Sequence, residues 1–220
     1  MSHKPAQSLP SDQRAVQRFA LLLRVGKLVT PSGEFLCVLR DVSDRGIKAR
    51  LFHDLPLDQG CELELNGRAR YRLERVWHRG DHAGFRFAES SIDIHQLIEE
   101  AGPFPKRHVR LRLKRPMALL LNSNGLTLPA QLTDISQHGA AVVLDQRLAI
   151  GQQLRLDAIR LPALHARVLW RRDMLHGLVF QEGFRLDALA ELAGRIQLGD
   201  EQVLFDSREA ANSPSALTGD

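Results

Sequence analysis

Aromatic residues are scarce in this sequence and make up 5% of its 220 positions. A surface that binds nucleic acid by base stacking combines a basic groove with exposed aromatic side chains. We therefore rank a nucleic-acid-binding barrel last among the candidate functions, because most of the few aromatic residues lie at positions expected to be buried. The 30 Lys and Arg exceed the 26 Asp and Glu, and this basic excess suits an anionic partner without identifying one.

Cysteine and long apolar runs are scarce as well. Cys37 and Cys61 do not have Cys-x-x-Cys spacing, and both lie in strand-like apolar runs. We therefore expect buried free thiols in a reducing compartment. The longest apolar runs are about one strand in length, so we expect neither a signal peptide nor a membrane span, and we expect a cytoplasmic location.

The motifs of common enzymes are missing. The sequence contains no Gly-x-Ser-x-Gly, no Gly-x-x-x-x-Gly-Lys and no Gly-x-Gly-x-x-Gly. Among nine histidines, only His78 and His82 approach the spacing of metal ligands, and they lack a partner motif. We expect no catalytic residue, no metal and no cofactor, and therefore a protein that is not an enzyme.

What the sequence does contain is the same pattern twice. An Asp-x-Ser-x-x-Gly motif occurs as Asp41, Ser43 and Gly46 and again as Asp134, Ser136 and Gly139. A Trp, a Gly and a Phe follow each motif, at Trp77, Gly84 and Phe87 and at Trp170, Gly177 and Phe180. Every pair is separated by 93 positions. One such motif is ordinary turn chemistry, but six positions in register predict two copies of one domain.

Alternation of apolar and charged residues predicts short antiparallel strands in both copies, as in Ile47-x-Ala49-x-Leu51. Short strands separated by turns are typical of a small barrel. Helical periodicity follows in Ile92–Ala101 and again from Leu186 to Ile196. The predicted fold is all-β, with two tandem six-stranded antiparallel β-barrels, each followed by a short C-terminal helix. We expect Trp77 and Trp170 to be anchors of the two cores.

Composition predicts the domain boundaries. Residues 1–13 and 206–220 are rich in small and polar residues and are expected to be disordered tails. The two domains are expected to span 14–101 and 106–200. A linker over 102–110 begins with a Gly-Pro-Phe-Pro sequence and also carries the basic loop of the second domain.

Paired basic residues precede the first strand of each copy. Arg14 and Arg18 form an Arg-x-x-x-Arg sequence, and counting back from Asp134 gives Lys106 and Arg110 in the corresponding places. An Arg-x-x-x-Arg loop, a strand pair, Asp-x-Ser-x-x-Gly and then Trp, Gly and Phe, in this order, resemble the PilZ domain over nearly the whole chain. The resemblance implies six-stranded barrels, and many members of that family bind the bacterial second messenger cyclic di-GMP.

In the first copy, the resemblance assigns ligand binding to Arg14, Arg18, Asp41, Ser43 and Gly46. Arginine suits this ligand because its planar cation can stack on a purine, donate two hydrogen bonds to guanine O6 and N7, and hold a phosphate. Asp41 would accept hydrogen bonds from guanine or orient an arginine, and Ser43 would bond to the ligand or to its own turn. Gly46 would permit a positive φ or a close approach of the ligand.

The second copy departs from the pattern in its basic loop. Its corresponding residues are Lys106, Arg107, Arg110, Asp134, Ser136 and Gly139. Lys106 is a point charge without the planar fork of arginine, although Arg107, Arg112 or Arg115 could substitute for it by a shift of the loop. We therefore expect the second domain to bind weakly or not at all by itself, and to serve mainly as a partner or dimer surface.

The leading prediction is a bacterial, non-enzymatic receptor or adaptor for cyclic di-GMP, whose shape or partner affinity changes on binding. The resemblance implies control of motility, attachment or exopolysaccharide production through a protein partner. We expect no nucleic acid as a partner, and a homodimer remains open. The alternative is a PilZ-like interaction scaffold that binds no nucleotide, because some members of the family lack the arginines.

Overall fold

The computed structural model describes residues 19–55, 60–65, 69–89, 92, 108–159 and 161–198. Both expected tails and most of the expected linker lie outside these residues. The predicted basic residues Arg14, Arg18, Lys106 and Arg107 also lie outside them, as does the expected first helix beyond Ile92.

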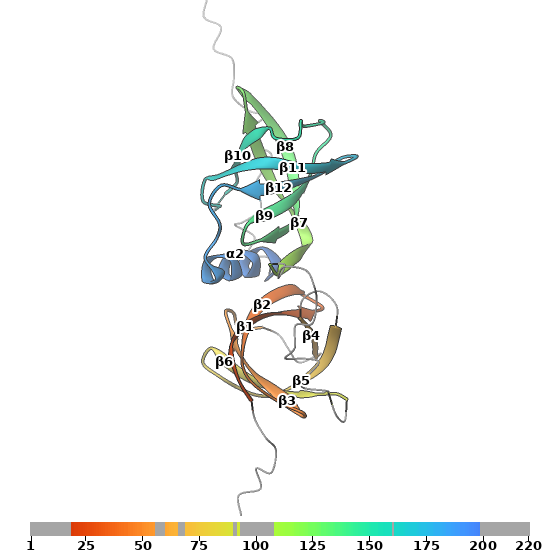
Figure 1. Cartoon of the computed structure of the whole chain (residues 1–220), viewed down its shortest axis with the longest axis vertical. Coiled ribbons are helices and arrows are strands. Elements are labelled where there is room, and N and C mark those ends of the chain that lie inside the picture. The colour runs from red at the N-terminus through yellow and green to blue at the C-terminus, as the bar shows by residue number, and fades with distance from the viewer. Residues whose placement is uncertain are drawn as a thin grey trace, which may run out of the picture.

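The described strands form two closed antiparallel barrels, which lie one above the other in Figure 1. Barrel 1 has the strand order β1-β2-β3-β6-β5-β4 and consists of β1 (Phe19–Thr30), β2 (Gly33–Ser43), β3 (Gly46–Leu51), β4 (Cys61–Leu65), β5 (Ala69–Arg79) and β6 (His82–Phe87). Barrel 2 has the order β10-β11-β12-β9-β8-β7 and consists of β7 (Arg110–Ser123), β8 (Leu126–Ser136), β9 (Gly139–Val143), β10 (Gln153–Asp157), β11 (Leu164–Arg172) and β12 (Leu175–Phe180). Helix α2 (Leu186–Leu198) follows barrel 2. The predicted pair of six-stranded barrels is confirmed.

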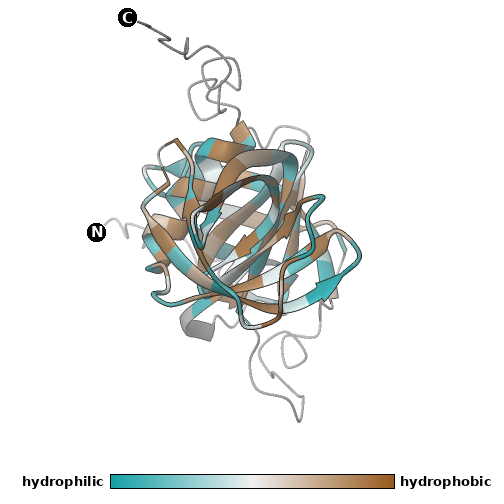
Figure 2. Ribbon diagram, turned by 90° about the horizontal axis from the view of Figure 1, so that it is seen from above, coloured by the Kyte–Doolittle hydropathy of each residue, from teal (hydrophilic) through white to brown (hydrophobic). Residues whose placement is uncertain are grey.

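Burial alternates along the strands as the period-two pattern of the sequence predicts. In β4, Cys61, Leu63 and Leu65 are buried, and Glu62 and Glu64 between them are half-buried. Hydrophobic and hydrophilic positions accordingly alternate along many ribbons in Figure 2. The inward residues fill the barrels with two apolar cores. Among the described residues, no helix combines the length and apolar character needed to cross a membrane.

The prediction of buried free thiols is confirmed. Cys37 and Cys61 are both buried and unpaired. Burial raises the pKa of each thiol to about 12, so both side chains are neutral core residues.

The two long strands β2 and β8 extend further than the sequence pattern suggests. Asp41 and Ser43 are the last part of β2, and Asp134 and Ser136 occupy the same place in β8. The motif therefore consists of the end of one strand, a two-residue turn and the first residue of the next strand. Arg110, which we expected in a loop, is the first residue of β7.

An irregularity in the first strand of each barrel explains a difference in spacing between the copies. In β1, the three residues 21–23 lie opposite Arg40 of β2. In β7, the four residues 113–116 lie opposite Thr133 of β8. The last of these is Pro116, which cannot donate to the ladder and is tolerated at such a bulge. The extra residue explains why Arg18 stands 23 positions before Asp41 in the first copy, whereas Arg110 stands 24 positions before Asp134 in the second.

The two barrels meet along the outer face of β2. Alternate residues of a strand point to opposite faces, yet every residue from Gly33 to Leu39 is buried. Leu36 on the outer face belongs to the apolar core cluster of barrel 2, against which Val25 and Phe52 of barrel 1 also pack. Barrel 2 therefore covers β2, with α2 between the two barrels in Figure 1.

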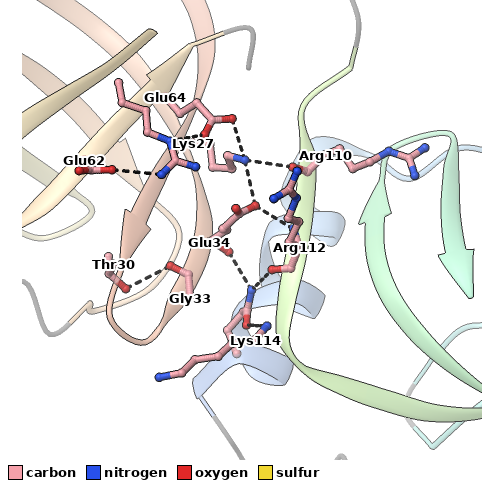
Figure 3. A network of polar contacts seen from close by, with 11 residues as sticks. Lys27, Thr30, Gly33, Glu34, Glu62, Glu64, Arg110, Arg112 and Lys114 are labelled. Carbon is pink, nitrogen blue, oxygen red and sulfur yellow. Dashed lines mark hydrogen bonds and ion pairs between the residues drawn. The ribbon is translucent and has the colours of Figure 1, made fainter. Parts of the chain in front are cut away.

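A buried lysine forms the polar part of this contact (Figure 3). Lys27 Nζ lies 2.9 Å from Glu34 Oε2 and 2.8 Å from Glu64 Oε1. Lys27 also donates to the backbone oxygen of Arg110 in barrel 2, at 3.5 Å. Glu34 Oε2 accepts a second hydrogen bond from the backbone N–H of Arg112, at 2.8 Å. The two barrels thus share one set of charge-assisted hydrogen bonds.

The end of α2 completes the contact. Gln197 is buried; its Oε1 accepts from the backbone N–H of Lys114 at 2.9 Å, and its Nε2 donates to the backbone oxygen of Arg112 at 2.6 Å. Two turns earlier, His53 Nε2 lies 2.8 Å from the backbone oxygen of Ala190. A Cβ at Gly194 would overlap this ring, so the glycine allows barrel 1 to approach the helix.

Candidate ligand-binding site

A hollow of about 290 Å³ lies in barrel 1 beside the first Asp-x-Ser-x-x-Gly motif. Strands β2, β3, β5 and β6 line it, together with the turn between β2 and β3. The described residues of the predicted site, Asp41, Ser43 and Gly46, all contribute to the lining. Arg14 and Arg18 lie outside the described residues, but Arg18 directly precedes Phe19, whose strand partner is Val42.

The motif serine shapes the turn in both barrels. Ser43 Oγ donates to the backbone oxygen of Gly46 at 3.3 Å and accepts from the backbone N–H of Arg45 at 3.4 Å. Ser136 Oγ donates in the same way to the backbone oxygen of Gly139, at 3.0 Å. Of the two roles expected for this serine, the structure shows the bond to its own turn.

The motif glycine does not have the positive φ that was one of its two expected roles. Neither Gly46 nor Gly139 has a positive φ. A Cβ at Gly46 would overlap the backbone oxygen of Phe85, and a Cβ at Gly139 would overlap that of Leu178. The glycine is therefore needed for the close approach of the neighbouring strand, and the expectation of an unusual backbone conformation was wrong.

The two tryptophans are not core anchors, and this prediction was also wrong. Trp77 is 39% exposed and Trp170 is 38% exposed. A register shift immediately precedes each of them in its strand, and such a bulge re-aims a side chain. Each ring lies against the glycine opposite, since a Cβ at Gly84 or Gly177 would overlap it. In barrel 1 this leaves Trp77 as an exposed aromatic wall of the hollow, on which a base can stack.

The motif aspartate differs between the barrels in its described contacts. Asp134 Oδ1 accepts a hydrogen bond from Arg110 Nη1 at 2.5 Å. The rings of His108 and His138 lie edge to face with their centroids 4.2 Å apart. The segment before β7 is therefore joined to the motif turn of barrel 2. Asp41 of barrel 1 is half-buried and lines the hollow.

Three cationic residues that the motif analysis missed also line the hollow of barrel 1. They are Arg45, Lys48 and Arg86. Lys48 and Arg86 are exposed, and Arg86 forms an ion pair with Glu74 of β5. In the alternating strand pattern, Lys48 and Arg86 looked like ordinary surface charges. A position-by-position comparison of the two copies could have distinguished them from the other surface charges.

The family model of the PilZ domain matches residues 105–197, which include barrel 2 and α2. No curated protein matches the chain in sequence.

Several solved structures resemble the chain at low identity. The Borreliella burgdorferi PlzA protein in complex with c-di-GMP is 15% identical, with 79% of this chain and 86% of that chain covered and a TM-score of 0.32. Escherichia coli YcgR in complex with c-di-GMP is 16% identical, with 85% and 86% covered and a TM-score of 0.29. The Bacillus subtilis inhibitor of motility, MotI/DgrA, is 17% identical, with 83% and 100% covered and a TM-score of 0.33.

Proposed function

We propose that the chain, whose residues 105–197 match the family model of the PilZ domain, is a non-enzymatic receptor for cyclic di-GMP. The observation that carries the proposal is the hollow of barrel 1, where Asp41, Ser43 and Gly46 gather beside an exposed tryptophan and three cations. A dianionic ligand with two guanines matches this combination of acceptor, cations and aromatic ring.

In barrel 1, Arg14 and Arg18 are proposed to complete the site. Arg18 directly precedes Phe19, and the partner of Phe19 is Val42, next to Ser43. An arginine fork donates to O6 and N7 of guanine, whereas adenine has a donor amine at position six. The site is therefore expected to prefer cyclic di-GMP to cyclic di-AMP.

In barrel 2, Asp134, Ser136 and Gly139 with Arg110, Lys106 and Arg107 are proposed as a weaker site. Asp134 already holds Arg110, so a ligand must compete with this carboxylate for the guanidinium. Lys106 offers a charge but no fork. These two features favour the alternative role for barrel 2, a scaffold surface that binds a partner rather than nucleotide.

Arg110 also connects the site of barrel 2 with the contact between the barrels. Its side chain holds Asp134, while its backbone oxygen accepts a hydrogen bond from Lys27 of barrel 1. A ligand or partner that moves Arg110 therefore acts on the buried charges between the domains. This link supports an adaptor whose domain contact responds to binding. We propose that it acts in the cytoplasm and regulates motility, attachment or exopolysaccharide production through a protein partner.

The test is calorimetric titration of the full chain with cyclic di-GMP. We expect Arg14→Ala/Arg18→Ala to weaken binding roughly 10- to 100-fold, because charge-assisted hydrogen bonds to the ligand are lost. The full chain is used because Leu36 of barrel 1 is part of the apolar cluster of barrel 2. An unchanged affinity in the double variant would remove the arginines from the site, and no binding by the wild type would overturn the proposal.

A further inference from the structure

We infer that Lys48 and Arg86 form a cationic subsite in the hollow of barrel 1, which holds a phosphate of the ligand and makes barrel 1 the tighter site. This inference rests on the proposed function and names the residues that set its affinity. It concerns side chains outside the Arg-x-x-x-Arg and Asp-x-Ser-x-x-Gly motifs.

The strand register places each cation beside a residue of the motif: Lys48 pairs with Asp41, and Arg86 pairs with Gly46. One row of paired residues crosses the sheet of barrel 1 in the order Asp41, Lys48, Gly84 and Trp77. Two rows further along, residues are paired in the order Ser43, Gly46, Arg86 and Glu74. Each cation therefore lies directly beside a motif residue of the proposed site.

Barrel 2 retains the framework of both rows but has no cation at the positions of Lys48 and Arg86. Its first row runs in the order Asp134, Ala141, Gly177 and Trp170. Its second row runs in the order Ser136, Gly139, Val179 and Arg167. Aspartate, serine, both glycines and tryptophan are unchanged, while Lys48, Arg86 and Glu74 are replaced by Ala, Val and Arg. The two copies thus keep the residues that shape the site and differ in the residues that charge it.

The exposure of the side chains at these positions also differs between the two barrels. Lys48 is exposed, whereas Ala141 is only 1% exposed. The Arg86 side chain is 66% exposed, whereas Val179 is half-buried. The positions that carry exposed cations in barrel 1 therefore carry a buried or half-buried apolar residue in barrel 2.

The contacts of the two cations assign them different tasks. Within the described part of the chain, Lys48 forms no ion pair, so its point charge is available to a phosphate oxygen. Arg86 is held by Glu74, and a phosphate must displace this carboxylate to use the guanidinium. Glu74 therefore competes with the ligand, and removal of its charge should strengthen binding.

The experiment is calorimetric titration of the full chain with cyclic di-GMP at two salt concentrations. Lys48→Ala and Arg86→Val install the residues of barrel 2 and should each weaken binding roughly tenfold, with a shallower salt dependence. Glu74→Gln should tighten binding. Arg79→Ala, which removes an exposed cation of β5 outside the hollow, is the matched control and should bind like the wild type.

Weaker binding by Lys48→Ala together with tighter binding by Glu74→Gln would support the subsite. A general loss of folding would instead lower the affinity of both variants. Wild-type affinity in Lys48→Ala and Arg86→Val would overturn the subsite while the proposed function stands. Equal losses in the two variants and in Arg79→Ala would show a diffuse charge effect and would also overturn it. No binding by the wild-type chain would overturn both proposals.

Discussion

At the scale of single residues, positions shared by the two copies turn out to serve strand packing as much as ligand binding. Gly46 lets β6 approach β3, and Gly84 makes room for the ring of Trp77. A repeat identifies such positions but not their task, because a close backbone contact and a ligand contact both favour glycine. This is why the repeat identified the residues, while the expected positive φ of Gly46 and the expected burial of the tryptophans were wrong.

The role of Gly46 predicts the effect of one added methyl group. In Gly46→Ala the new Cβ would overlap the backbone oxygen of Phe85, so the β3–β6 ladder must shift. We expect a loss of about 2 kcal/mol in the free energy of unfolding, as for other overpacked sites. Urea denaturation would measure it, with Arg45→Ala in the adjacent turn as a control that keeps the backbone N–H. A stability equal to that of the control would contradict this account.

At the scale of secondary structure elements, the strands were predicted better than their ends. Period-two alternation predicted the barrel strands, and helical periodicity predicted α2. The alternation could not show that β2 and β8 continue through Asp41 and Asp134, because a half-buried polar residue at a strand end reads as a turn. Nor could it show that β2 is covered on both faces, since burial by another domain leaves no periodic signal.

The two buried faces of β2 predict different costs for alanine substitutions on the outer faces of β2 and β8. Leu36 is 3% exposed beneath barrel 2, whereas Gln131 on the outer face of β8 is exposed. Leu36→Ala should therefore cost about 2 to 4 kcal/mol in the free energy of unfolding, and Gln131→Ala should cost little. Thermal or urea unfolding of the full chain would measure both. Similar small losses in the two variants would mean that the barrels do not share a core in solution.

At the scale of the whole molecule, the two copies are joined head to tail rather than symmetrically. The outer face of β2 is covered by β7 and α2, while the outer face of β8 carries exposed Thr127, Pro129 and Gln131. The repeat predicted two barrels but could not predict this arrangement, because Leu36 and Pro129 occupy corresponding positions with different neighbours. The buried charges around Lys27 belong to this asymmetric contact.

These charges predict how stability depends on pH. Burial opposes ionisation of Glu64, but hydrogen bonds from Lys27 and Arg70 outweigh it and hold the pKa of this carboxyl below its usual value. A carboxyl whose folded pKa is lowered stabilises the fold above its unfolded pKa, and this contribution is lost as the pH falls through the folded pKa. Glu64→Gln should therefore destabilise the chain near pH 7 and have little effect in acid below the usual range of glutamate.

Unfolding of the wild type and Glu64→Gln across this pH range would measure the difference. Glu62→Gln is the matched control, because Glu62 lies on the same strand, contacts the exposed Arg70 and has a more exposed side chain. A difference between wild type and Glu64→Gln that stays constant with pH would show that the carboxylate charge is not what stabilises the contact.

We propose barrel 1 as the principal binding site, and the two tryptophans of the chain allow this proposal to be tested directly. Trp77 lines the hollow of barrel 1, and Trp170 occupies the same place in barrel 2. Fluorescence titration of Trp170→Phe with cyclic di-GMP reports on Trp77, and titration of Trp77→Phe reports on Trp170. We expect the fluorescence of Trp77 to change and saturate at a lower ligand concentration than any change in the fluorescence of Trp170. A response of Trp170 alone, or first, would contradict it.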